Sequence, residues 1–150
     1  MKSLLSAVII GLIGCSAQAQ TLFEPDFPLV ILNAADTDLS EFVWKNRPII
    51  VFANSENDPA FIEQMELLIA RPEALTERDV VVIVDTDAET LSPIRRRMRP
   101  RGFMLTLVGK DGDIKLRKPF PQDVREITAS IDKMPIRKLE VRNAKERASE

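Results

Sequence analysis

Two continuous apolar runs constrain the fold of this chain more than any other feature. They are IIVFA at residues 49–53 and DVVVIVD at residues 79–85, and their Val and Ile content is typical of strands buried on both faces. Between them, apolar residues recur at helical spacing from Pro59 to Ala70, and Asp58 before Pro59 is a typical helix start. Because parallel strands need a crossover connection, the sequence predicts a β-α-β unit.

The rest of the chain supplies further elements around this unit. Apolar spacing indicates three more helices, and the Asp111-Gly112 turn between two apolar stretches indicates a hairpin. The predicted helices are 38–48, 88–98 and 121–134, and the predicted hairpin is 102–118. The order β-α-β-α-β-β-α is that of an α/β, thioredoxin-like three-layer sandwich with a central mixed sheet.

The chain therefore divides into four predicted segments. They are a leader at 1–19, a lead-in at 20–40, the thioredoxin-like domain at 41–141 and a charged, disordered tail at 142–150. The aromatic side chains of the domain are expected in its core rather than at a ligand site. These aromatic residues are Phe42, Trp44, Phe52, Phe61 and Phe103.

The leader has the composition of an export signal. Lys2 precedes the apolar stretch LLSAVIIGLIG, and Ala17-Gln18-Ala19 forms a small-residue cleavage site before Gln20. The stretch LIGC, which ends at Cys15, also resembles a bacterial lipobox, in which Cys15 would carry lipid. Two locations follow from these alternatives: export to the periplasm or the medium, or a lipid anchor on the envelope. Contact with a membrane is expected only if Cys15 is lipidated.

The reactive side chains of most enzymes are missing from this sequence. It contains no histidine, and its single cysteine, Cys15, lies in the predicted leader. After either cleavage the domain would have no imidazole base, no free thiol, and neither thiolate nor imidazole to ligate a metal. Ser55 has no histidine to activate it. The sequence therefore predicts no catalytic residue and no cofactor, and favours a protein that is not an enzyme.

Two stretches carry a resemblance to thioredoxin. A thioredoxin start of the type LVDFWAEWCGPC aligns without a gap on IIVFANSENDPA at 49–60, and its redox cysteines then fall on Asn57 and Ala60. The RGIPTLLLFKNG pattern aligns on RGFMLTLVGKDG at 101–112, where the family's cis-proline position holds Met104. In the first aligned stretch, the position of thioredoxin's buried carboxylate holds Val51. The resemblance implies the fold without thiol chemistry, and a trans bond at Met104, since a cis bond costs about 3 kcal/mol there.

Three further stretches resemble the domain-of-unknown-function 4174 family. They are WKNRPIIVFA at 44–53, LVGKDGDIKLR at 107–117 and IDKMPIRKLE at 131–140. Members of that family have a thioredoxin-like, peroxiredoxin-like scaffold and occur in bacterial secreted proteins and in animal extracellular proteins with sushi repeats. The family has no established activity, so the resemblance implies a fold and a compartment. Its animal members suggest extracellular association, by analogy alone.

Charge is distributed unevenly along the chain. Residues 20–92 hold 15 acidic and 4 basic side chains, whereas residues 93–118 hold 9 basic and 2 acidic ones. Arginine and lysine bind carboxylates and phosphates, so the second segment is a candidate site for an anion or a protein partner. Its members are Arg95, Arg96, Arg97, Arg99, Arg101, Lys110, Lys115, Arg117 and Lys118. The alternative is a solvated surface whose charges pair with the acidic part of the same molecule.

Three carboxylates form a weaker candidate site. Asp85, Asp87 and Glu89 follow a predicted strand, at the edge of the sheet where α/β folds often bind ligands. Their spacing matches no complete cation-binding loop, and Asp87 can instead cap the next helix. No metal site is therefore predicted.

These features lead to one preferred hypothesis and two alternatives. The first is an exported, non-catalytic interaction module whose basic face binds an anionic envelope component or an acidic protein surface. Nucleic acid is disfavoured, because the chain is acidic overall and lacks aromatic residues among its arginines. The alternatives are a thiol-independent enzyme or redox accessory protein, and an envelope lipoprotein with a structural role.

Overall fold

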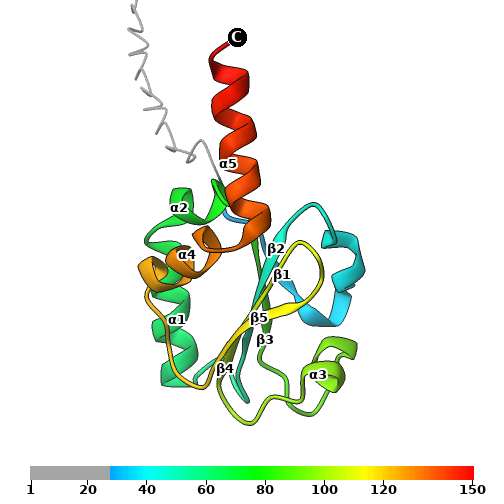
Figure 1. The fold of residues 1–150 in the computed structure, drawn as a ribbon. Helices are drawn as coiled ribbons and strands as arrows, with labels where there is room; N and C mark the ends of the chain where they lie inside the picture. Colours follow the sequence, from blue (N-terminus) through cyan, green and yellow to red (C-terminus); the bar gives the residue numbers. More distant parts are fainter. Residues whose placement is uncertain (1–27) are drawn as a thin grey trace, which may run out of the picture.

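The computed structural model describes residues 28–150, in which five strands form one mixed sheet (Figure 1). The strands are β1 (Ile31–Asn33), β2 (Arg47–Phe52), β3 (Val80–Asp85), β4 (Met104–Val108) and β5 (Ile114–Lys118). They lie in the order β1-β3-β2-β4-β5. β3 is parallel to both β1 and β2, whereas β4 is antiparallel to β2 and to β5. The predicted β-α-β unit and hairpin are confirmed.

Helices cover both faces of this sheet and complete the three layers (Figure 1). One face packs against α1 (Pro59–Ile69), α2 (Pro72–Thr76) and α4 (Val124–Asp132). The other packs against α3 (Pro93–Met98) and the 3-10 helices η1 (Ala34–Asp36) and η2 (Leu39–Phe42). Because successive strand residues point to opposite faces, β2 contributes Ile49 and Val51 to one core and Ile50 and Phe52 to the other.

The carboxyl ends of β2 and β3 meet at one edge of the sheet, called here the carboxyl edge. Phe52 lies beside Asp85 in the parallel register and opposite Met104 in the antiparallel one. The loop to α1 leaves β2 at this edge, and the segment that leads to α3 leaves β3 there. The carboxyl edge therefore brings together three segments on which the sequence places candidate residues. They are the loop after β2, the segment after β3 and the start of β4.

The first part of the domain differs from the prediction. The lead-in at 20–40 contributes β1 and η1, and the helix expected over 38–48 is reduced to the four residues of η2. The chain leaves η2 through Trp44, which has a φ of 63° and donates its N–H to the carbonyl of Lys110 at 2.7 Å. This turn leaves the indole 68% exposed, so the prediction of Trp44 in the core is wrong.

The other four aromatic residues follow the prediction more closely. Phe52 and Phe103 are buried, and Phe42 and Phe61 are half-buried against the two cores.

The carboxyl-terminal segment is helical, so the prediction of a disordered tail at 142–150 is wrong. It forms α5 (Pro135–Ala148), which starts with proline and is rich in Lys, Arg, Glu and Ala, all residues that favour helix. α5 projects from the sheet and has no fully buried residue (Figure 1).

The structure describes the domain but not the predicted leader, so it bears on membrane contact only in part. Within residues 28–150, none of the helices combines the length and apolar character needed to span a bilayer. The predicted leader, including Cys15, lies outside the described residues.

Candidate functional site

The loop after β2 holds the positions that align with redox cysteines. Asn57 is exposed and donates its N–H to Ser55 Oγ at 3.1 Å. Ala60 lies in the first turn of α1 and donates its N–H to Asp58 Oδ1 at 2.9 Å. Met104 starts β4, and every peptide bond of residues 28–150 is trans. The side chains of Ser55 and Asp58 therefore cap a turn and a helix.

A buried ion pair lies at the start of this loop. Arg95 of α3 and Asp85 of β3 have side chains that are 6% and 3% exposed, and Arg95 Nη2 lies 2.8 Å from Asp85 Oδ1. Arg95 also donates to the main-chain carbonyls of Ala53 and Asp85, at 2.7 and 2.9 Å. Ser92 Oγ donates to the second carboxylate oxygen, Asp85 Oδ2, at 2.7 Å. The pair thus ties α3 to the ends of β2 and β3.

The prediction of Arg95 as part of an exposed anion-binding face is therefore wrong. Ile94 and Met98 are buried in the second core, and Arg95 shares their side of α3. The guanidinium lies 5.6 Å from the centre of the Phe52 ring, within the range of a cation–π contact. The protein itself engages Nε and Nη2 of Arg95 and leaves the side chain only 6% exposed, so Arg95 is not part of an open binding surface.

The carboxylates at the end of β3 and just after it do not converge on a common metal site. Asp85 is engaged by Arg95, and Asp87 Oδ1 accepts the N–H groups of Glu89 and Thr90, both at 3.0 Å. These hydrogen bonds, that from Thr90 first, hold the pKa of Asp87 below its ordinary value. Asp87 caps a turn, since the N-cap of α3 is Ser92. Residues 28–150 contain no group of three or more His, Cys, Asp or Glu side chains placed to hold a metal ion.

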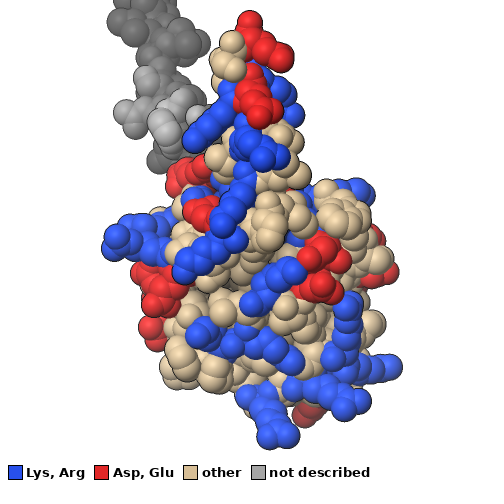
Figure 2. All heavy atoms as spheres, viewed as in Figure 1, with Lys and Arg blue, Asp and Glu red and all other residues tan. Residues whose placement is uncertain are grey.

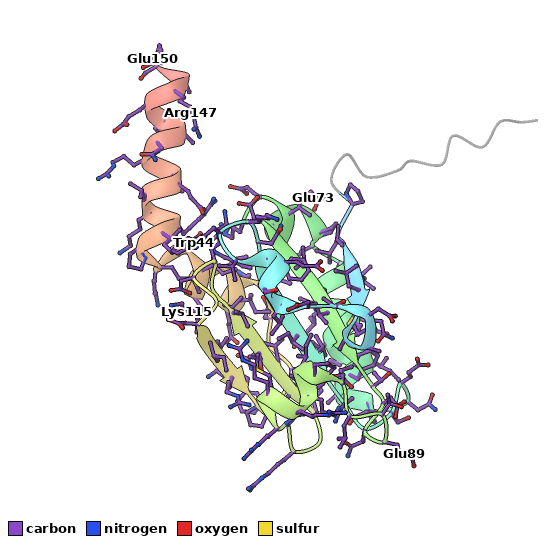
Figure 3. All side chains as sticks on the ribbon, turned by 90° about the vertical axis from the view of Figure 1, so that its right-hand side faces the viewer. Trp44, Glu73, Glu89, Lys115, Arg147 and Glu150 are labelled. Carbon is purple, nitrogen blue, oxygen red and sulfur yellow. The ribbon has the colours of Figure 1, made fainter. Side chains whose placement is uncertain are left out.

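Two of the predicted cations lie near the hairpin turn rather than beside the arginines. Lys110 Nζ lies 2.7 Å from Asp79 Oδ2 and 2.8 Å from Glu140 Oε1, and Lys115 Nζ lies 2.6 Å from Asp111 Oδ2. Figure 3 shows Lys115 at the end of the domain that carries α5, and Glu89 at the other end. Lys110 and Lys115 therefore neutralise carboxylates of the same chain, as the solvated-surface alternative predicts.

The remaining cations gather where α3 leads into β4 and where β5 ends. Four of them line one cavity of about 240 Å³, together with Phe103, Met104 and Pro119. We call these four the basic patch: Arg99, Arg101, Arg117 and Lys118. Arg96 and Arg97 are exposed on α3 but do not line this cavity, and Arg97 instead lines a hollow with Leu39 and Val108. Figure 2 shows Lys and Arg side chains gathered at the end of the molecule opposite α5.

Within residues 28–150, no member of the basic patch forms an ion pair. Arg117 donates to the carbonyl of Met98, and Lys118 Nζ lies 5.9 Å from the centre of the Phe120 ring. Met104, at the cis-proline position of the thioredoxin pattern, forms part of the cavity wall. The patch thus combines four positive charges with a partly apolar hollow.

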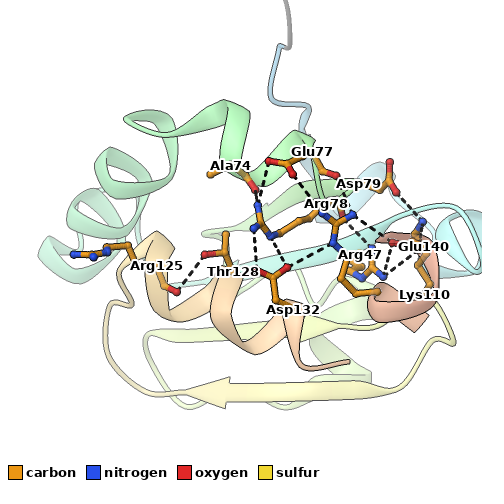
Figure 4. Close-up of polar contacts among 11 residues, drawn as sticks. Arg47, Ala74, Glu77, Arg78, Asp79, Lys110, Arg125, Thr128, Asp132 and Glu140 are labelled. Atoms are coloured by element: carbon orange, nitrogen blue, oxygen red, sulfur yellow. Dashed lines mark hydrogen bonds and ion pairs between the residues drawn. The ribbon is translucent and has the colours of Figure 1, made fainter. Parts of the chain in front are cut away.

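A second polar cluster, which the sequence analysis missed, fixes the base of α5 at the opposite end of the sheet (Figure 4). Arg47 is fully buried and donates to Glu140 Oε1 at 3.1 Å and to the carbonyl of Arg78 at 3.0 Å. Arg78 in turn holds both carboxylate oxygens of Asp132, each at 2.9 Å. This cluster joins β2, α4 and α5.

The carboxylates of this cluster are held in their charged form. Hydrogen bonds from Arg78 lower the pKa of Asp132. Burial raises the pKa of Glu140, but hydrogen bonds from Lys110 and Arg47 outweigh that effect and hold it below its ordinary value. A single buried arginine at the start of a strand does not change the apolar periodicity of the sequence. The only sequence signal for this cluster was a charged residue, Arg47, directly before the apolar run.

The sheet order and the loop after β2 define this protein as a thioredoxin-like α/β domain. The chain belongs to the family described as domain of unknown function DUF4174, whose model matches residues 38–140. The predicted family and fold class are confirmed.

Solved structures agree on the fold. The chain is similar to the reduced 2-Cys peroxiredoxin of Plasmodium vivax, with 13% identity, a TM-score of 0.53, and coverage of 64% of this chain and 81% of that one. It is also similar to chloroplastic thioredoxin z, with 16% identity, a TM-score of 0.52, and coverage of 71% and 97%. A search of curated proteins found no match. At these identities the similarity shows the fold alone.

Proposed function

We propose that this domain is an interaction module that binds an anionic partner through the basic patch. The observation that carries the proposal is the convergence of Arg99, Arg101, Arg117 and Lys118 on one cavity without a carboxylate among its lining residues. Like charges held together around a hollow raise the local potential and attract an anion. Guanidinium groups add paired hydrogen bonds to carboxylate or phosphate oxygens.

The carboxyl edge supports a non-catalytic role. Asp85 is neutralised by Arg95, and Asp58 and Ser55 accept main-chain N–H groups. An acid or base in catalysis needs a free polar atom that faces a substrate. Ser55 and Asp58 instead fix the backbone where thioredoxin carries its thiols.

Export completes the proposal, because the leader at 1–19 has the pattern of a signal peptide. Mass spectrometry of the protein recovered from its native envelope fraction tests this point. An amino terminus at Gln20 would support plain export, an acylated Cys15 would support the lipoprotein alternative, and an intact leader would contradict both.

The binding proposal is tested with dextran sulfate, a general polyanion that offers negative charge but no peptide or nucleotide sequence. We expect the protein to bind it, with an affinity that falls as salt rises, and we expect Arg99→Glu/Arg101→Glu/Lys118→Glu to weaken binding at least tenfold. The matched control reverses three exposed cations of α5, Arg142, Lys145 and Arg147, and so changes the net charge equally. Equal losses in the two triple variants would show that general charge, and not the basic patch, controls binding.

A further inference from the structure

We propose that the partner of the basic patch is an acidic peptide that adds to the sheet as a strand along β5. This inference rests on the proposed function and names the class of partner and its mode of binding. Three observations carry it: the free edge of β5, the sign of the charges along it, and the cavity at its end.

The first observation is that β5 ends the sheet. Within residues 28–150 it pairs with β4 alone, and none of its main-chain groups bonds to a loop or a helix. An edge strand has a row of N–H and C=O groups that a second extended chain can satisfy. The other edge strand, β1, is only three residues long and carries no basic residue.

The second observation concerns the occupant. β5 has the sequence IKLRK, and Lys115 and Arg117 lie on the same face of the strand. Lys115 is paired with Asp111, whereas Arg117 has no ion pair among the described residues. A second copy of β5 would place like charges across from each other, which destabilises a pair of strands. A strand with acidic residues at alternate positions instead places a carboxylate beside the unpaired Arg117 and extends the ion pair of Lys115 and Asp111. Charge therefore disfavours self-pairing and favours an acidic peptide.

The third observation is the cavity at the carboxyl end of β5. Its volume of about 240 Å³ lies below the roughly 300–1,000 Å³ of pockets that enclose a whole small-molecule ligand. Phe103, Met104 and Pro119 give it apolar walls, and Arg117 and Lys118 connect it to the strand. It suits one apolar side chain of a bound peptide, while neighbouring carboxylates contact Arg99 and Arg101.

The test uses the fluorescently labelled L-peptides EVEVEF and FEVEVE, which present the acidic residues and the aromatic residue in both chain directions. We expect one of them to bind at least tenfold more tightly than its D-enantiomer, which has the same charge and composition. Alternate N–H groups of a bound strand point toward β5, and the others point away from it. N-methylation of the first set should abolish this preference because it blocks the hydrogen bonds to β5, whereas N-methylation of the second set should not. Replacing the phenylalanine of the peptide by alanine should weaken binding several-fold.

Slower hydrogen exchange of β5 amides in the complex would locate the strand. Equal binding of the L- and D-peptides would overturn strand addition, and so would unchanged exchange along residues 114–118. If dextran sulfate binds to the protein and neither L-peptide does, this inference fails and the proposed function stands. If neither probe binds, both fail.

Discussion

Replacing Arg95 by methionine is expected to destabilise the domain strongly. The substitution leaves the Asp85 carboxylate, 3% exposed, without its guanidinium and removes a donor from the Ala53 carbonyl. Removing one partner of a buried pair costs about 3–5 kcal/mol. Methionine is long and flexible enough to keep contact with the Phe52 ring, so most of this cost is electrostatic. At a few degrees per kcal/mol for a domain of this size, the unfolding midpoint should fall by at least about 10 °C.

The assay is thermal unfolding followed by circular dichroism, with Arg96→Met as the matched control. Arg96 is exposed and donates to the Leu91 carbonyl at 2.9 Å, so its replacement should change stability by less than about 0.5 kcal/mol. The double variant Asp85→Leu/Arg95→Met removes both charges and should recover part of the loss. If Arg95→Met and Arg96→Met have equally small effects, Arg95 is a solvated surface cation and the reasoning is refuted.

Two further predictions concern Glu140 and Trp44. Because the folded state depresses the pKa of Glu140, its charge stabilises the protein above the ordinary pKa near 4 and loses this effect as pH falls through the lower folded value. Glu140→Gln should therefore lower the free energy of unfolding in urea at pH 7 and have a much smaller effect at pH 3; an equal effect at both would contradict this. The single tryptophan, Trp44, should be quenched by acrylamide in the folded protein, and Trp44→Ala should cost under about 1 kcal/mol, whereas a buried indole would cost about 3–5 kcal/mol.

The central strands and the α1 crossover could be predicted from sequence, because a strand buried on both faces needs a continuous run of apolar residues. Six consecutive buried residues in β2 require a run such as RPIIVF, and Asp58 before Pro59 marks the start of the next helix. The thioredoxin-like order followed from these elements. β1 escaped prediction because three residues at the edge of a sheet carry too little periodicity.

The candidate site was predicted only in part, since a run of arginines does not reveal which member faces inward. Pro93 fixes the start of α3, and Ile94 and Met98 define its buried side, which places Arg95 inward and Arg96 outward. That spacing was present in the sequence, but the partner, Asp85, was visible only in three dimensions. Lys110 was misassigned for a similar reason, because its two carboxylates come from distant segments.

The tail was misjudged because charge and high polarity favour both a disordered segment and an exposed helix. What distinguishes them is the contact between Glu140 and the buried Arg47, which are far apart in the sequence. This contact holds the base of α5 on the domain, and helix-favouring residues continue the helix from there.

The most direct test of the central claim is to map anion binding residue by residue. ¹⁵N-labelled protein would be titrated with inorganic tripolyphosphate at low salt, and amide shifts recorded by NMR. We predict the largest shifts at the four residues of the basic patch and at Phe103, small shifts along α5, and loss of the patch response in the Arg99→Glu/Arg101→Glu/Lys118→Glu variant. Shifts spread evenly over the exposed cations of α3, β5 and α5 would contradict the account, because the basic patch would then be one part of a uniformly solvated surface.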